Sequence, residues 1–356
     1  MEITLPDGSS KILESGSTGY DLAKSIGSGL AKSAVAININ GENKDLFDKL
    51  PDNSSVSIIT IDSQDGLEIM RHTLTAQVLA KAIKNLYPDS KLAIGPTIEN
   101  GFYYDVSTEI PISIDDLPEI ENEMKRIIEK KSEIVKSLHS KKDAKKLFKE
   151  KKESFKIEII DDADQTEDFQ IYKNADEDFI DLCRGPHLPN LSFIGAFKLT
   201  KVSGAYWKGD SSNQMLTRIY GTAWRSEKEL LDYLKTIEEA EKRDHRKIGK
   251  DMDLFHFQDE APGMVFWHPK GWTIYSTLKS YMSEMQAKAN YKEINTPSVI
   301  DRKLWEKSGH WDKYRENMFI TEIDEEHANE KRVNALKPMN CPGHVQVYNQ
   351  GIRSYK

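Results

Sequence analysis

The chain has 356 residues, which is enough for two or three domains at roughly 100–200 residues each. Its 58 acidic and 50 basic residues give a net charge of −8, so any contact with RNA must come from local basic patches rather than from the overall charge. The two cysteines, Cys183 and Cys341, exclude a disulfide scaffold and indicate a reducing compartment. Because no stretch approaches the ~18 apolar residues of a membrane span and the N-terminus lacks a signal-peptide pattern, we expect a cytoplasmic protein with no membrane contact.

Residues 1–61 carry the pattern of a small domain that mixes strands and one helix. Alternating apolar residues surround two turn signals, Pro-Asp-Gly at 6–8 and Asn-Gly at 40–41. Ser17 or Thr18 could cap a short helix that has Leu22, Ala23 and Ile26 as its apolar residues and Gly27 at its end. Two hairpin-like units around one helix predict a β-grasp, ubiquitin-like domain of the TGS type, and the polar residues 62–66 are predicted to be a linker.

Residues 62–225 are predicted to form a second domain of helices and strands. An amphipathic helix is expected over 75–87, where Pro88 would stop it. Pro118 suits the first turn of another helix, and Ser140 suits the cap of a third.

Two charged runs and a change of composition complete the organisation of the chain. Solvated faces are the simpler interpretation of the lysine-rich run 141–152 and the acidic run 161–181, although the lysines could also contact RNA phosphates. The charged residues 226–242 predict a linking helix, and aromatic residues and glycines become frequent within 243–356.

Cys183 and His187 form the first chemical cluster. The intervening Arg-Gly-Pro predicts a tight loop that could turn the thiol and the imidazole toward one pocket, and His72 precedes the predicted helix. Three interpretations stay open from the residues alone: a zinc site, a cysteine nucleophile, or polar groups around a substrate. A buried cysteine beside a surface histidine, without function, is the simpler alternative.

Four longer motifs give this cluster a context. They occur in the order Ala93–Asp105, Asp181–Asn190, Gly204–Asp210 and Gln214–Trp224. Together they resemble the editing domain of bacterial threonyl-tRNA synthetases. The resemblance implies hydrolysis of seryl-tRNA formed by mistake on threonine tRNA. A synthetic site sized for threonine cannot exclude the smaller serine, because one methyl group is worth only ~1–3 kcal/mol.

The resemblance also implies which residues form the editing pocket. It assigns catalytic roles to His72, Lys156, Asp181, Cys183 and His187. One departure is visible: the second histidine of the family's His-x-x-x-His pair falls on Gln77, with one extra residue after His72. Glutamine can form hydrogen bonds but cannot act as a base, and the change makes a four-ligand zinc site less favourable.

The second chemical cluster is Lys337–His344, which reads Lys-Pro-Met-Asn-Cys-Pro-Gly-His. With Pro262–His268 and Leu304–Trp311, it resembles the start of the class II catalytic domain of the same synthetases, which has an antiparallel sheet. The resemblance implies that Cys341 is a zinc ligand, with the remaining ligands beyond residue 356, and that Met339 lines the threonine pocket. It further implies ATP with Mg²⁺, threonine and threonine tRNA as partners, and a homodimer.

We therefore expect an α+β multidomain protein with four parts. They are the β-grasp domain 1–61, the editing domain 62–225, the linking helix 226–242 and an incomplete catalytic domain 243–356. The leading hypothesis is a threonine–tRNA ligase with hydrolytic editing. A stand-alone aminoacyl-tRNA hydrolase acting in trans, or a non-enzymatic RNA-binding paralogue, are the alternatives.

Overall fold

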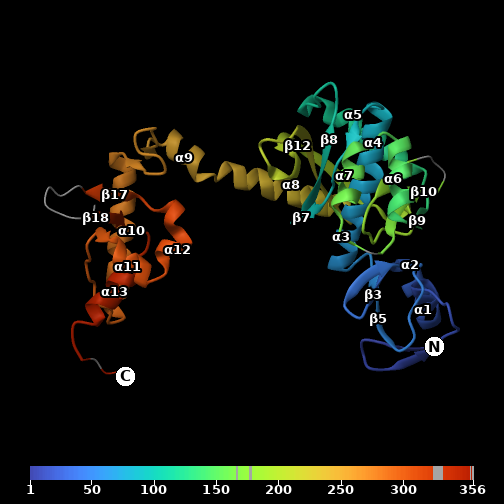
Figure 1. The fold of residues 1–356 in the computed structure, drawn as a ribbon, viewed down its shortest axis with the longest axis horizontal. Helices are drawn as coiled ribbons and strands as arrows, with labels where there is room; N and C mark the ends of the chain where they lie inside the picture. Colours follow the sequence, from blue (N-terminus) through green and yellow to red (C-terminus); the bar gives the residue numbers. More distant parts are fainter. Residues whose placement is uncertain (166, 176–178, 324–331, 353, 355–356) are drawn as a thin grey trace. The chain divides into compact units, whose positions relative to one another are not determined.

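The computed structural model describes residues 1–356 except 166, 176–178, 324–331, 353 and 355–356 (Figure 1). The chain divides into two compact units, Met1–Lys242 and Arg243–Lys356, each described by itself. Both units mix helices and sheets, which agrees with the predicted α+β class. No helix within the described part of the chain is long and apolar enough to cross a bilayer.

The N-terminal part of the first unit is a five-stranded sheet packed on two short helices. The strands lie in the order β2-β1-β5-β3-β4, with β1 parallel to β5 and the other pairs antiparallel. Its core is formed by apolar side chains such as Ile3, Leu22 and Ile37, which are fully buried. The elements are β1 (Glu2–Thr4), β2 (Ser10–Ile12), α1 (Gly19–Ile26), α2 (Ser28–Ser33), β3 (Ala34–Ile39), β4 (Glu42–Asp45) and β5 (Ser54–Thr60).

The central helix of the first unit begins earlier than predicted. Ser63 accepts a hydrogen bond from the backbone N–H of Gly66, so a helix starts at Gln64 and the predicted linker 62–66 is wrong over its second half. Three helical segments follow one another: α3 (Gln64–Thr73), a π-helix (Leu74–Leu79) and α4 (Ala80–Leu86). The backbone N–H of Ala80 donates to the carbonyl of Thr75, five residues back, which is the widened turn that takes up an extra residue.

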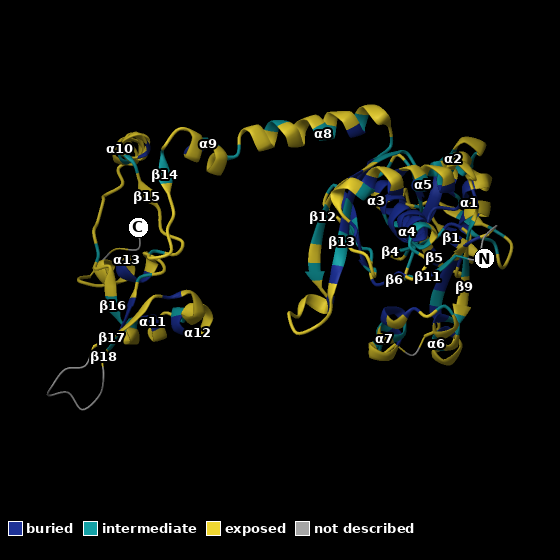
Figure 2. Ribbon diagram, turned by 90° about the horizontal axis from the view of Figure 1, so that it is seen from above, coloured by how far each residue is buried: buried dark blue, intermediate teal, exposed yellow. Residues whose placement is uncertain are grey.

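This central helix lies between two further sheets and is buried along most of its length (Figure 2). One sheet has the order β12-β13-β8-β6, with β7 also paired to β8, and the other has the order β11-β10-β9. Their strands are β6 (Lys91–Leu92), β7 (Thr97–Ile98), β8 (Gly101–Ser107), β9 (Ile134–His139), β10 (Phe169–Asn174), β11 (Ile180–Leu182), β12 (Ala196–Tyr206) and β13 (Met215–Trp224).

Three helices cover these sheets. They are α5 (Leu117–Glu129), α6 (Lys141–Glu150) and α7 (Ser154–Asp162). Short 3₁₀ turns precede α5 (Ile114–Asp116) and flank β12 (Leu191–Phe193 and Trp207–Gly209). Pro118 stands in the first turn of α5, and Ser140 caps α6 by accepting from the N–H of Asp143, both as predicted. Helix α8 (Glu227–Lys242) is the last element of the first unit and lies within the range predicted for the linking helix.

The second unit contains a short hairpin, a long helix and a three-stranded antiparallel sheet of order β16-β18-β17. Helix α10 exposes a row of large apolar side chains, among them Trp272, Leu278 and Tyr281. The elements are α9 (His245–Asp251), β14 (Phe255–His256), β15 (Phe266–Trp267), α10 (Pro269–Lys288), β16 (Val299–Asp301), α11 (Arg302–Lys307), α12 (His310–Tyr314), a 3₁₀ turn (Arg315–Asn317), β17 (Ile320–Ile323), β18 (Arg332–Leu336) and α13 (Cys341–Tyr348).

Candidate active site in the first unit

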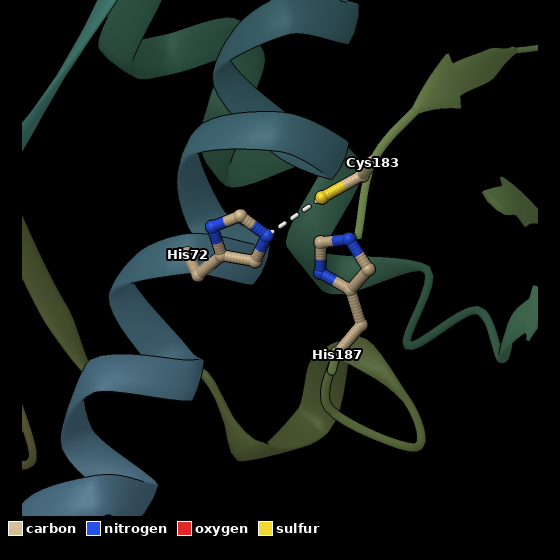
Figure 3. Close-up of side chains that lie close together, drawn as sticks. All are labelled: His72, Cys183 and His187. Atoms are coloured by element: carbon tan, nitrogen blue, oxygen red, sulfur yellow. Dashed lines mark hydrogen bonds between the residues drawn. The ribbon is translucent and has the colours of Figure 1, made fainter. Parts of the chain in front are cut away.

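Three of the predicted site residues meet beside the central helix (Figure 3). His72 comes from α3, whereas Cys183 and His187 come from the loop that follows β11. The His72 Nε2 and Cys183 Sγ atoms are 2.7 Å apart, and the two imidazole rings stack with centroids 4.7 Å apart. The loop thus brings together side chains that lie far apart in the sequence.

The hydrogen bonds of Thr73 define the tautomer of His187. The Thr73 hydroxyl lies 2.9 Å from the carbonyl of Ile69, accepts from the N–H of Leu188 at 2.9 Å, and lies 3.1 Å from His187 Nδ1. A hydroxyl has one proton, and Ile69 offers the nearer acceptor, so Nδ1 of His187 must carry the proton that it donates to Thr73. The lone pair of His187 is therefore on Nε2, an atom that is buried and has no hydrogen-bond partner.

His72 is held in its neutral form. Burial lowers the pKa of its imidazole below the ordinary value, even though the carboxylates of Asp181 and Asp45 oppose the shift. A neutral ring has a lone pair on one of its two nitrogens, and Nε2 accepts from the Cys183 thiol across the 2.7 Å contact in the tautomer that carries its proton on Nδ1. The same nitrogen could accept a proton from water if the thiol moved aside.

A second group of buried polar residues lies next to this cluster. Lys156 on α7 and Asp181 on β11 form an ion pair of 2.6 Å, and they are only 3% and 2% exposed. Tyr104 on β8 donates to the other carboxylate oxygen at 3.1 Å and accepts from Lys156 at 3.2 Å. Burial, with help from Asp181, raises the pKa of Tyr104 well above its ordinary value, so its hydroxyl stays protonated and remains a donor.

Tyr104 is a site residue that the sequence reasoning did not single out. The sequence indicates only that Tyr104 lies on a strand, β8, in which Phe102, Tyr104 and Val106 are fully buried at alternate positions. An alternation of this kind reads as core packing, because nothing in it tells that one hydroxyl meets a buried carboxylate.

The two groups open onto one pocket of about 710 Å³. Four of the predicted residues line it: His72, Lys156, Asp181 and Cys183. Its size lies within the roughly 300–1,000 Å³ typical of small-molecule sites, and its mixed polar and apolar lining suits a ligand with a few polar groups. Strand β4 of the N-terminal sheet also contributes to its wall.

Gln77 does not line this pocket, whereas Ala76 does. The side chain of Gln77 is 0% exposed, and neither atom of its amide has a hydrogen-bond partner. Both residues lie in the π-helix Leu74–Leu79, and it is Ala76 that faces the pocket where the alignment placed Gln77. No second imidazole therefore comes from this helix.

The ligand set His72, Cys183 and His187 is the single group of three or more potential metal ligands among the described residues, with its ligand atoms within 4.8 Å of one another. Two ligands on one tetrahedral zinc lie about 3.5 Å apart, given bonds of ~2.1 Å to nitrogen and ~2.3 Å to sulfur. The 2.7 Å between His72 Nε2 and Cys183 Sγ is shorter, because the two atoms contact each other directly. As placed, these residues fit a hydrogen-bonded cluster better than a metal site.

The predicted residues of the second unit, Met339 and Cys341, are not part of a group of potential metal ligands among the described residues. Cys341 is exposed at the start of α13, and Met339 is exposed with its sulfur 3.3 Å from His310 Nε2. In the part of the chain that the structure describes, no group of three potential ligands includes Cys341. One thiolate cannot hold zinc, which takes at least three protein ligands.

Comparison with known families defines the class of protein. Residues 170–220 match the threonyl and alanyl tRNA synthetase second additional domain, and residues 1–60 match the TGS domain. The first match contains Asp181, Cys183 and His187. The first unit therefore contains one segment similar to a TGS domain and one similar to a domain of threonyl and alanyl tRNA synthetases.

Individual relatives narrow the class. A threonine–tRNA ligase of Prochlorococcus marinus subsp. pastoris is 52% identical over 355 residues, which are 100% of this chain and 54% of the relative. A threonine–tRNA ligase of Marinobacter nauticus is 51% identical over 354 residues, which are 99% of this chain and 54% of the relative. The predicted resemblance to the threonyl-tRNA synthetases is confirmed along the whole chain, which spans about half the length of these relatives.

A solved structure, the RNA binding domain of threonyl-tRNA synthetase from Cryptosporidium parvum Iowa II, is 38% identical over 32% of this chain and 27% of that chain. Its TM-score is 0.29, which is too low to bear on the fold.

Proposed function

We propose that the first unit is the proofreading site of a threonine–tRNA ligase and hydrolyses serine from mischarged threonine tRNA. One observation carries the proposal. The neutral His72, the Cys183 thiol and the Lys156–Asp181 ion pair open onto a single pocket. Ester hydrolysis requires these features: a general base, a positive charge in a fixed position and a pocket that holds the substrate.

Each residue has a role in this proposal. Neutral His72 accepts a proton from the attacking water, and His187 offers a second lone pair at Nε2. The ammonium group of Lys156, held by Asp181, stabilises the negative charge that develops on the ester oxygen. Tyr104 keeps the Asp181 carboxylate oriented through its hydroxyl.

The pocket would discriminate by size, since the synthetic site cannot. His72 and Ala76 both line the pocket, and in this proposal the wall beside the reacting ester has no space for the extra methyl group of threonine. Selection against threonine would then arise at the step of entry, which complements the ~10–200-fold limit of a single binding site.

For the whole protein we propose ATP-dependent attachment of threonine to its tRNA, with Mg²⁺ as the partner of ATP and the cytoplasm as its location. The threonine–tRNA ligases to which the chain is similar support this activity. In this proposal Cys341 supplies one ligand to zinc and Met339 contacts threonine. The apolar side chains exposed on α10 support a homodimer.

The two alternatives differ in what they require of the pocket. A hydrolase that acts in trans would use the same residues, so the pocket supports it equally. A non-enzymatic RNA-binding paralogue would have no need of a buried ion pair beside a neutral histidine, and the retention of both groups speaks against it.

Deacylation of serine-charged threonine tRNA by the 356-residue chain tests the proposal. We expect His72→Ala to slow hydrolysis by about 10²–10⁴-fold, the usual contribution of a general base. His139→Ala is the matched control, because His139 lies in the same unit on β9, its ring forms a hydrogen bond with Ser137, and it is not among the residues that line the pocket. Equal rates for the two variants would overturn the role of His72.

A further inference from the structure

Asp45 lies at the end of β4, in the N-terminal sheet, yet most of its contacts are to the editing part of the unit. Its Oδ1 accepts from the backbone N–H of His187 at 2.9 Å. Its Oδ2 accepts from the hydroxyl of Tyr172 at 2.7 Å and pairs with Lys136 at 2.8 Å. One carboxylate therefore joins β9, β10 and the loop that carries Cys183 and His187.

The loop passes so close to this junction that a side chain could not be accommodated. A Cβ added to Gly185 would lie 2.1 Å from the Tyr172 hydroxyl and 3.6 Å from Asp45 Oδ2. Gly185 also has a φ of +64°, which favours glycine. The glycine of the Cys-Arg-Gly-Pro-His motif thus allows the loop to rest on Tyr172, the residue that Asp45 holds.

Tyr172 links Asp45 to the imidazole of His187. Its ring meets the ring of His187 edge-on, with centroids 4.4 Å apart and planes inclined by 77°. Burial, together with the neighbouring Asp45 carboxylate, raises the pKa of Tyr172, so its hydroxyl stays protonated and keeps donating to Asp45. Asp45 therefore fixes His187 twice, through its backbone and through its ring.

The same strand forms part of the pocket wall. Glu42, Asn43, Lys44, Asp45 and Asp48 line the pocket together with His72, Lys156 and Cys183. Lys136, which bridges Asp45 and Asp48, lines it too. We propose that the N-terminal domain completes the hydrolytic pocket and that Asp45 is a positioning residue, which holds the Cys183–His187 loop in its reactive shape.

This proposal rests on the proposed function for the identity of the substrate, but not for the role of Asp45 in the loop. The terminal nucleotides of the tRNA would lie against β4 when the ester enters the pocket. Loss of Asp45 would then misplace His187 and lower the rate of the chemical step more than the binding of tRNA.

Three variants of the full chain separate these effects. Asp45→Ala removes the acceptor and the charge, and Asp45→Asn keeps an acceptor for the His187 N–H. Tyr172→Phe keeps the ring but removes the hydroxyl, which contacts Asp45 at 2.7 Å and Gln170 Oε1 at 3.0 Å. Asp62→Ala is the control, because Asp62 is an exposed aspartate just after β5 with no part in the pocket.

Hydrogen exchange of the His187 amide is the first readout, and it does not depend on activity. We expect Asp45→Ala to speed this exchange by at least about 10-fold, since a buried hydrogen bond is lost, and Asp45→Asn to restore most of the protection. The control should exchange like the unaltered chain. Unchanged exchange in Asp45→Ala would overturn the positioning role.

Hydrolysis of seryl-tRNA is the second readout. Asp45→Ala should lower kcat by about 10-fold or more with KM changed less than about twofold, and Asp45→Asn should recover part of kcat. A loss confined to KM, or no rescue by asparagine, would contradict the proposal. If the unaltered chain fails to hydrolyse seryl-tRNA, the proposed function fails, while the exchange experiment still decides the role of Asp45. Should Asp45→Ala not fold, Tyr172→Phe tests the link to the ring instead: it should lower kcat with KM changed less than about twofold, and an unchanged kcat would overturn that link.

Discussion

Replacing Lys156 by methionine would leave the Asp181 carboxylate buried without a counter-charge. Removing one partner of a buried ion pair costs ~3–5 kcal/mol, because the remaining charge is neither solvated nor paired. Here the carboxylate keeps two donors, the hydroxyl of Tyr104 at 3.1 Å and the backbone N–H of Leu182 at 2.8 Å. We therefore expect a loss of stability near the lower end of that range, about 3 kcal/mol.

The double variant Lys156→Met, Asp181→Leu tests the reason for this loss. It removes both charges and leaves the buried Tyr104 hydroxyl without its acceptor, which costs ~1–3 kcal/mol. The N–H of Leu182 also loses its acceptor, but Leu182 is only half-buried, so water can replace the carboxylate there. The double variant should therefore be at least as stable as Lys156→Met alone, although both should be inactive in hydrolysis. Such a result separates the loss of stability caused by an unpaired charge from the loss of hydrolytic activity.

Urea unfolding followed by hydrogen exchange of peptides from residues 64–86 provides the assay, because this buried helix reports on the first unit alone. Replacement of Lys149, an exposed lysine on α6, by methionine is the control and should change the free energy of unfolding little. A loss below about 1 kcal/mol for Lys156→Met, or a double variant less stable than the single one, would refute the reasoning.

Three further predictions follow from the site. Gln77→Met should leave hydrolysis unchanged within about twofold and raise stability by about 1 kcal/mol, because it removes two buried polar atoms without partners; a marked loss of activity would show that Gln77 reaches the substrate. Because burial lowers the pKa of His72, the unfolded chain binds a proton at its imidazole near pH 6.5, whereas the folded chain does not. The free energy of unfolding should therefore fall as the pH drops through that value. In His72→Gln this fall should be smaller when unfolding is measured as a function of pH. Treatment with a chelator should leave hydrolysis unchanged, since His72 and Cys183 contact each other directly; activity that vanished and returned with added zinc would contradict this.

Local signals were enough for much of the fold. The alternation in the N-terminal strands, Pro118 at the start of α5 and Ser140 at the cap of α6 each depend on neighbouring residues, so the sequence displays them directly. The start of the central helix was missed because residues 62–66 are polar. Their helical state comes from the cap at Ser63 and from packing of the residues that follow.

Only the site residues that belong to sequence motifs could be predicted. His72, Lys156, Asp181 and Cys183 were expected from the resemblance, and the structure brings them to one pocket. The exchange of Gln77 for Ala76 on the pocket wall was not visible, because an alignment cannot tell how a helix absorbs one extra residue.

Asp45 and Tyr172 were missed for a different reason. Their link to His187 depends on how the N-terminal sheet packs against β9 and β10, and no local pattern encodes a contact between domains. The glycine at 185 gave the one hint, because a glycine next to proline implies either a turn or a close approach.

In the proposed function, the pocket of the first unit removes serine and spares threonine. The most direct measurement is the rate of deacylation of seryl-tRNA and threonyl-tRNA, both on threonine tRNA, by the 356-residue chain. We expect hydrolysis of the serine ester to be at least about 10-fold faster than that of the threonine ester, and to be slow for the serine ester in His72→Ala. Equal rates for the two esters, or no hydrolysis of either by folded protein, would contradict it.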